Sequence, residues 1–131
     1  MGPADAIRSG EVRLTIPANP RFLRLARLAA SGVATDAGFD LDHLEDLRLA
    51  IDEACAVLLE GAPGGDLELV YRFRADGGVE IEGSCPSDGS DLRLHPVAAD
   101  LLAVTTTEHH LASDSNRRRF RLVKLPEAPG A

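Results

Sequence analysis

Residues 47–63 read "LRLAIDEACAVLLEGAP", and they place Asp52 and Glu53 inside an apolar helical run. Asp40 stands where the N-cap of a helix is expected and Gly61 where a helix ends. Apolar side chains recur at three- and four-residue spacing, which predicts a helix with one face in the core. The predicted core-facing residues are Leu44, Leu47, Ile51, Ala54 or Cys55, and Leu58. Glu53 belongs to a different stripe, one helical turn before Val57.

The sequence before this helix predicts a strand followed by another helix. "EVRLTIPA", residues 11–18, alternates apolar and polar side chains, which indicates a half-buried strand that ends at Pro17. Asn19 can cap the helix that follows, with Pro20 in its first position and Gly38 just beyond its end. The inner face of this helix is predicted to contain Phe22, Leu25, Leu28 or Ala29, and Gly32 or Val33.

After residue 63 the apolar period changes from helical to alternating. "DLELVYRFRA" and "GVEIEGSC" flank "DGG", which predicts a β-hairpin, and "HPVAADLLAV" predicts a short helix. "TTEHHLAS" and "RRRFRLVKL" flank "SDSN" and predict two closing strands. This order predicts an α/β (α+β) two-layer sandwich, with helices packed on one face of a mixed, mainly antiparallel sheet.

Length and charge restrict the classes of function. A chain of 131 residues suits one domain, which we expect at residues 11–125, with flexible tails at 1–10 and 126–131. The formal charge of -7 argues against direct nucleic-acid binding, because neutralising phosphates needs an excess of Lys and Arg. Neither a signal peptide nor an apolar membrane-spanning run is present, so we expect no membrane partner and a cytoplasmic location.

Residues 16–55, "IPANPRFLRLARLAASGVATDAGFDLDHLEDLRLAIDEAC", resemble the anti-sigma factor serine kinases of the RsbW and SpoIIAB type. These proteins belong to the GHKL superfamily, whose HATPase-like domain is also called the Bergerat fold. The resemblance therefore implies that residues 11–125 form a histidine-kinase-like ATPase domain. It also implies that ATP and Mg²⁺ are held between the helices and the sheet.

The residues that would hold ATP depart from the family pattern. Glu53 matches the Glu that accepts a proton, but Val57 replaces an Asn that ligates Mg²⁺, and valine has no oxygen to offer the metal. Cys85 and Ser87 stand at the Asp and Gly of the adenine-binding motif, and no glycine-rich lid precedes Pro96. We therefore expect a degenerate kinase with no cofactor, in which Glu53 is a vestigial catalytic residue.

The resemblance also implies the partners. Arg27 matches a residue that helps to hold a sigma factor, and Arg21 and Arg24 flank it, so the three are candidate sigma-binding residues; a solvated basic stripe is the alternative. We expect a partner-switching regulator that sequesters an RNA polymerase sigma factor and is released by a STAS-type anti-anti-sigma protein. A homodimer is implied as well. The alternatives are an active ATP-dependent kinase that phosphorylates a STAS antagonist, and an interaction module unrelated to sigma factors.

The cysteines and histidines give weaker signals. By the resemblance, Cys55 and Cys85 flank the nucleotide pocket, which makes them a candidate redox pair; two small buried thiols are the simpler interpretation. His109 and His110 are adjacent on a predicted strand and therefore point to opposite faces. They cannot easily share a metal ion, and we expect no metal site.

Overall fold

The computed structural model describes residues 10–61 and 63–126. The predicted tails, 1–10 and 126–131, lie outside these residues except for Gly10 and Pro126. The elements along the chain are β1 (Glu11–Pro17), the 3₁₀ helix η1 (Pro20–Phe22), α2 (Leu23–Asp36), α3 (Leu41–Leu59), β2 (Asp66–Phe73), β3 (Val79–Pro86), α4 (Pro96–Thr105), β4 (Glu108–Ser113) and β5 (Arg117–Lys124). All the predicted helices and strands are therefore present.

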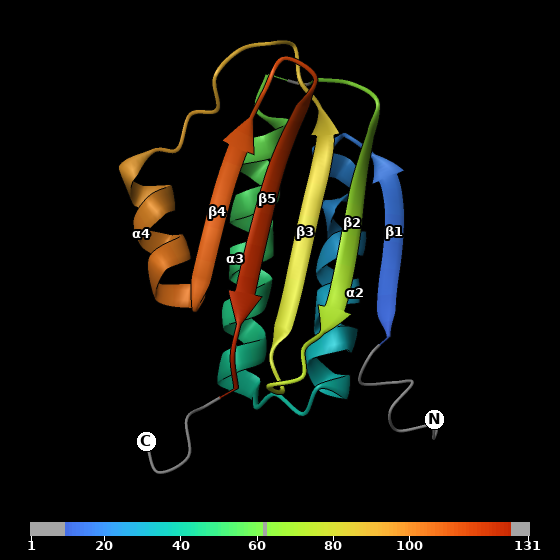
Figure 1. Ribbon diagram of the computed structural model, residues 1–131, viewed down its shortest axis with the longest axis vertical. Coiled ribbons are helices and arrows are strands. Elements are labelled where there is room, and N and C mark those ends of the chain that lie inside the picture. The colour runs from blue at the N-terminus through green and yellow to red at the C-terminus, as the bar shows by residue number, and fades with distance from the viewer. Residues whose placement is uncertain (1–9, 62, 127–131) are drawn as a thin grey trace.

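The five strands form one sheet in the order β1-β2-β3-β5-β4 (Figure 1). All four pairings are antiparallel, so the prediction of a mainly antiparallel sheet is confirmed. The prediction that the sheet is mixed was wrong, since the described strands contain no parallel pair. Helix α4 connects β3 to β4, and these two strands run in the same direction. They are not paired, because β5 lies between them.

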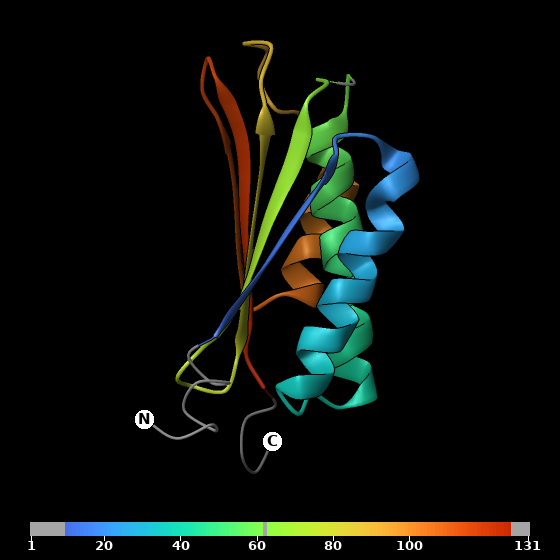
Figure 2. The same cartoon turned by 90° about the vertical axis from the view of Figure 1, so that its right-hand side faces the viewer.

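The helices cover one face of the sheet and leave the other face open (Figure 2). The core lies between the two layers, and its largest fully buried side chains include Tyr71, Phe120, Leu47, Ile51 and Leu58. The hydroxyl of Tyr71 on β2 donates a hydrogen bond of 2.8 Å to the carbonyl oxygen of Ala26 on α2. The two-layer sandwich predicted from the order of elements is confirmed.

The long helix α3 agrees with its sequence pattern. The Asp40 side chain caps it by accepting a hydrogen bond of 2.8 Å from the backbone N–H of His43. Gly61 lies just past its end at a φ of 82°, a conformation that glycine adopts without strain. The predicted core positions from Leu47 to Leu58 are buried, and Leu44 packs against them.

The predicted inner face of α2 was partly wrong. Its buried residues are Ala26, Ala30, Val33 and Ala34, whereas Leu28 is 64% exposed. The predicted Phe22, Leu25 and Ala29 do pack against the core, and the predicted Val33 is part of it. Alanine side chains then allow α2 to lie close to its neighbours.

Candidate functional site

Arg118 is buried although its side chain is charged. It lies on the same face of β5 as the core residues Phe120 and Leu122, and its side chain is 5% exposed. One guanidinium nitrogen, Nη1, donates to the carbonyl oxygens of Leu58 at 2.9 Å and Glu60 at 2.6 Å. These carbonyls lie at the C-terminal end of α3, where backbone acceptors lack helical partners. Arg118 therefore caps the end of this helix.

The other guanidinium nitrogen of Arg118 reaches the loop that joins β3 to α4. Nη2 donates to the Ser90 hydroxyl at 2.9 Å and lies 3.5 Å from a carboxylate oxygen of Asp88. The Ser90 backbone and hydroxyl also donate to Asp88, and these hydrogen bonds keep the pKa of that carboxyl below its ordinary value. One side chain thus joins the sheet, the end of α3 and this loop.

Cys85 is the direct partner of Arg118 across the β3 and β5 pairing. Its thiol is fully buried and lies 3.6 Å from the carbonyl oxygen of Leu58, to which it can donate. Burial raises the pKa of this thiol, although the charge of Arg118 acts in the opposite direction. The thiol of Cys55 on α3 is also buried, and burial raises its pKa as well.

The other positions that the resemblance marks as departures from the family pattern lie around the same end of α3. Val57 is 5% exposed, and it lines a depression of about 210 Å³ together with Arg118 and Asp88. Ser87, just past the end of β3, donates from its backbone N–H to the carbonyl oxygen of Asn116. The loop from Ser87 to His95 contains one glycine, Gly89. The structure therefore gathers Val57, Cys85 and Arg118, and the sequence analysis had missed Arg118.

Glu53 lies apart from the Arg118 contacts. It is half-buried on α3 and lines a depression of about 430 Å³ between η1, α3 and α4, whose walls are mainly apolar. Among the residues that the structure describes, no ion pair or side-chain hydrogen bond involves Glu53, so its carboxylate is available to accept one. The apolar wall residues are Pro20, Leu23, Ala56, Val57, Leu59, Val97 and Ala98.

The three arginines of the predicted sigma-binding stripe differ in their surroundings. Arg21 and Arg24 are exposed, and the Arg21 guanidinium lies 5.6 Å from the centre of the Phe22 ring. Arg27 is half-buried, and its Nε donates to Asp52 on α3 at 3.0 Å. Asp52 is thus the partner of Arg27. Arg21 and Arg24 keep their guanidinium groups free of ion pairs within the described residues.

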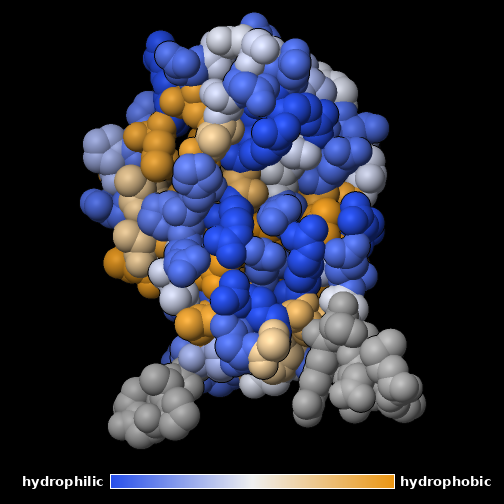
Figure 3. Space-filling view, viewed as in Figure 1, coloured by the Kyte–Doolittle hydropathy of each residue, from blue (hydrophilic) through white to orange (hydrophobic). Residues whose placement is uncertain are grey.

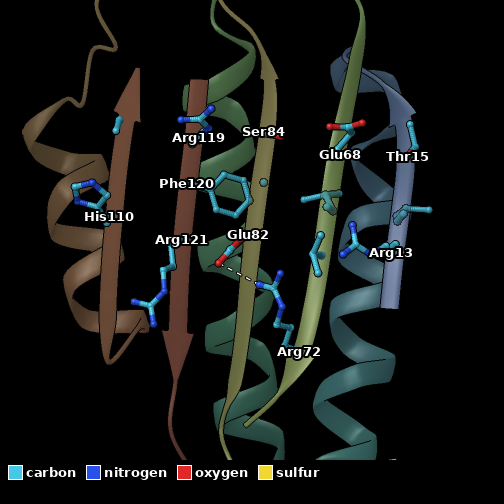
Figure 4. A pocket seen from close by; sticks show the side chains of 15 residues that line it. Arg13, Thr15, Glu68, Arg72, Glu82, Ser84, His110, Arg119, Phe120 and Arg121 are labelled. Atoms are coloured by element: carbon cyan, nitrogen blue, oxygen red, sulfur yellow. Dashed lines mark ion pairs between the residues drawn. The ribbon is translucent and has the colours of Figure 1, made fainter. Parts of the chain in front are cut away.

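Another depression, about 630 Å³, lies elsewhere, on the open face of the sheet (Figure 4). Arginine and glutamate side chains from neighbouring strands line it and pair with one another; Arg72 lies 3.1 Å from Glu82. His110 lies on this open face, whereas His109 on the other face is 3.5 Å from the Thr106 hydroxyl, as the strand alternation predicts. None of the predicted site residues lines this depression.

The histidines, cysteines and carboxylates are dispersed. Across residues 10–61 and 63–126, they form no cluster of three or more that could hold a metal ion. The two cysteines are free thiols. Over the same residues, no helix combines the length and the apolar character needed to cross a membrane.

Comparison with known proteins places the chain near one group of kinases, although no family model matches it. The serine-protein kinase RsbW of Bacillus subtilis is 37% identical over 89 residues, which cover 68% of this chain and 48% of the relative. RsbW of Bacillus pumilus is 36% identical over 66 residues, 47% of this chain and 41% of the relative. RsbW of Listeria innocua is 31% identical over 84 residues, 64% and 48% respectively. The matches span less than half the length of these relatives.

The fold agrees with this relationship. A crystal structure of the RsbU and RsbW domains of a Mycobacterium tuberculosis protein superposes with a TM-score of 0.74, covering 92% of this chain and 34% of the other at 15% identity. The resemblance predicted from residues 16–55 is thereby confirmed. The chain is a homologue of the RsbW-type serine-protein kinases and has their GHKL-like α/β fold.

Proposed function

We propose that the chain is an anti-sigma factor-like regulator that sequesters an RNA polymerase sigma factor, is released by a STAS-type anti-anti-sigma protein and does not transfer phosphate. The proposed absence of phosphate transfer rests on one observation, the buried guanidinium of Arg118 between the end of α3 and Cys85. By the family resemblance, this is where the nucleotide would be held. Regulation by competition between partners needs only a difference in binding free energies.

The contacts of Arg118 disfavour a nucleotide at this place. A ligand that displaced the guanidinium would leave the buried carbonyl of Leu58 without its charged donor, and an unpaired buried acceptor costs about 1–3 kcal/mol. Val57 offers no oxygen ligand for Mg²⁺, which takes oxygen ligands almost exclusively. The short loop after Ser87 ties its Ser90 to the same guanidinium instead of covering a phosphate group.

The α2 surface supports the proposed capture of a sigma factor. Within residues 10–61 and 63–126, Arg21 and Arg24 have no ion-pair partner, and such guanidinium groups suit bidentate contacts to carboxylates of an acidic partner. Arg27 is held by Asp52 at a partly exposed position, so a partner would have to compete with that carboxylate. Arg24 is therefore a cleaner test position than Arg27.

Calorimetry with Mg-ATP, with Bacillus subtilis RsbW as the positive control, tests the absence of kinase chemistry. We expect no heat of binding and no transfer of labelled phosphate to a STAS protein encoded in the same genome. Glu53 matches the catalytic Glu of the family and has no ion-pair partner among the described residues, which favours the active kinase as the second candidate. Saturable Mg-ATP binding together with phosphate transfer would establish that alternative.

Co-purification of the tagged chain from its own cells tests the partners. We expect a sigma factor and a STAS protein to be recovered, and Arg24→Glu to reduce the recovered sigma factor. Arg119→Glu, on the open sheet face, is the matched control. If neither partner is recovered, the interaction module unrelated to sigma factors becomes the better hypothesis. Light scattering of the purified chain tests the homodimer, which only the resemblance implies.

A further inference from the structure

Strand β4 forms one edge of the sheet. Its residues, Glu108–Ser113, pair with β5 in a continuous register without a bulge. An edge strand directs the N–H and C=O groups of every second residue away from its neighbour, where they can pair with another strand. In the sheet of the described residues, the outer side of β4 has no partner strand. The backbone of β4 is therefore available for pairing.

The two edges of the sheet differ in their protection. Natural edge strands are often protected from further pairing by proline, by lysine and other charged side chains, or by bulges. The opposite edge, β1, ends in Pro17, which has no N–H to donate, and it carries the ion pair between Glu11 and Arg13. The sequence of β4 is "EHHLAS", with neither proline nor lysine nor arginine. β4 is therefore the less protected edge.

Helix α4 lies beyond this edge. Figure 1 shows α4 outside β4, and Figure 2 shows it in the helix layer. A helix is about 10 Å wide and strands are about 4.8 Å apart, so α4 can cover one further strand beside β4.

The exposed surface of α4 is mainly apolar. Its exposed residues are Pro96, Val97, Asp100, Ala103 and Val104, and only Asp100 is charged. Figure 3 shows apolar atoms gathered on the side of α4, while the open face of the sheet is mainly hydrophilic. A strand added to β4 would therefore meet apolar side chains on its helix side and water on the other.

We propose that β4 accepts an extended segment of a partner protein as a sixth strand of the sheet. The backbone of the segment pairs with β4, which is the mode of recognition known as β-strand addition. Its apolar side chains pack against α4, and its alternate, polar side chains lie beside His110 and Ala112 on the open face. The site therefore selects a segment that alternates apolar and polar residues.

A second copy of this chain does not fit the edge. If β4 paired with β4 of another copy in one continuous sheet, both α4 helices would lie on the same face of that sheet. Packed helices need about 8–10 Å between their axes, whereas the two strands would be about 4.8 Å apart. Because each α4 lies beyond its own β4, the two helices would overlap.

The ends of this chain do not fit either. Residues 127–131 read "EAPGA", whose proline cannot donate to a ladder and whose glycine disfavours a strand. Residues 1–9 precede β1, at the opposite edge of the sheet. Crossing the sheet takes about 19 Å, or about six extended residues, so too few remain for a strand. A segment of another protein, without a helix of its own at this edge, is the occupant that fits.

Selection from a phage-displayed library of random peptides, about ten residues long, tests the proposal on the immobilised full chain. We expect the enriched peptides to alternate apolar and polar residues. NMR of the ¹⁵N-labelled chain then locates a synthetic copy of one enriched peptide. Its binding should shift the amide signals of β4 and α4, slow the hydrogen exchange of β4, and leave β1 unchanged.

Methylation of the peptide backbone separates strand pairing from side-chain contact. Two versions of the enriched peptide are made, one N-methylated at its odd positions and the other at its even positions. Only one of these two sets of N–H groups faces β4, because the groups of a strand alternate in direction. One version should therefore bind at least about tenfold more weakly, and the other about as well as the unmodified peptide. Fluorescence anisotropy measures each Kd.

Substitutions on the chain test the contribution of α4. Ala103→Asp combined with Val104→Asp should weaken the unmodified peptide at least about tenfold, since these neighbouring exposed positions then present charge to its apolar side chains. Val12→Asp, at a 42% exposed valine of the opposite edge strand, is the matched control and should leave binding unchanged. Circular dichroism verifies that each variant is folded.

Three outcomes would overturn the proposal: no enriched peptide, shift changes in β1 or α2 instead of β4, or equal affinity of the two N-methylated peptides. The peptide comparison uses the wild-type chain, so it does not depend on how well a variant folds. The test is independent of sigma capture, since it uses neither a sigma factor nor a STAS protein.

Discussion

Arg118 and Cys85 face each other across β3 and β5, and both contact the carbonyl oxygen of Leu58, at 2.9 Å and 3.6 Å. The guanidinium makes the shorter contact and also reaches Glu60 and Ser90. The carbonyls of Leu58 and Glu60 belong to the end of α3, where backbone acceptors lack helical partners. The guanidinium is therefore the centre of the polar contacts at this end of the fold.

Replacing Arg118 by Met should destabilise the fold strongly. The apolar stem is kept, but the carbonyls of Leu58 and Glu60 lose their donor, so we expect the free energy of unfolding to fall by about 2–4 kcal/mol. Urea unfolding followed by circular dichroism measures this loss. Arg119→Met, at the neighbouring position with a 61% exposed side chain, should cost less than about 0.5 kcal/mol. Equal losses in the two variants would contradict the assigned role of Arg118.

Replacing Gly83 by Ala should destabilise the core. Gly83 pairs with Phe120 across β3 and β5, and a Cβ atom at Gly83 would overlap the Phe120 ring. We expect Gly83→Ala to cost about 1–3 kcal/mol, because the ring must leave its position. Combined with Phe120→Leu, the same substitution should cost less than on its own, which a double-mutant cycle of urea unfolding measures. Strict additivity of the two losses would disprove the proposed overlap.

The cysteines should resist thiol reagents in the folded chain. Cys55 and Cys85 are buried, and burial raises the pKa of both thiols, so the reactive thiolate is rare at neutral pH. Ellman's reagent should label them slowly in buffer and rapidly in urea, and should find two thiols per unfolded chain without added reductant. If the unreduced chain has no free thiols, the candidate redox pair forms a disulfide after all.

Acid should weaken the cap of α3. Hydrogen bonds from the backbone N–H and the ring of His43 hold the pKa of Asp40 below its ordinary value. The carboxylate therefore adds stability above the unfolded-state pKa, and that stability is lost as the pH falls through the folded-state pKa. Asn keeps the capping oxygen but does not titrate. The stability difference between wild type and Asp40→Asn should therefore shrink below about pH 4, as measured by urea unfolding. A difference that stays constant to lower pH would contradict this prediction.

The order of helices and strands could be predicted because the apolar patterns of the local sequence agree with the way these elements pack in the folded chain. The alternation in residues 11–17 and the capped apolar pattern ending at Gly61 both persist in the structure. The inner face of α2 was predicted in part, because its further buried residues are Ala26, Ala30 and Ala34, whose small side chains give a weak apolar pattern. For one position of that face the pattern left Leu28 and Ala29 open; Ala29 packs against the core, whereas Leu28 is exposed.

The positions of Val57 and Cys85 could be predicted by resemblance, but the contacts made there could not. Arg118 shares its strand face with Phe120 and Leu122, and a charged residue in an apolar register was the available signal. Its acceptors at Leu58 and Ser90 come from segments far apart in the sequence. Only the folded chain brings them together.

The burial of Arg118 also bears on how the energy state of a cell affects this fold. A bound ligand stabilises a protein by RT ln(1 + [L]/Kd), so a nucleotide-binding domain gains or loses stability as nucleotide levels change. Arg118 is part of the chain, and its contacts with Leu58 and Glu60 form without any bound ligand. Under the proposed function, the melting temperature of the purified domain should therefore be the same with and without added nucleotide.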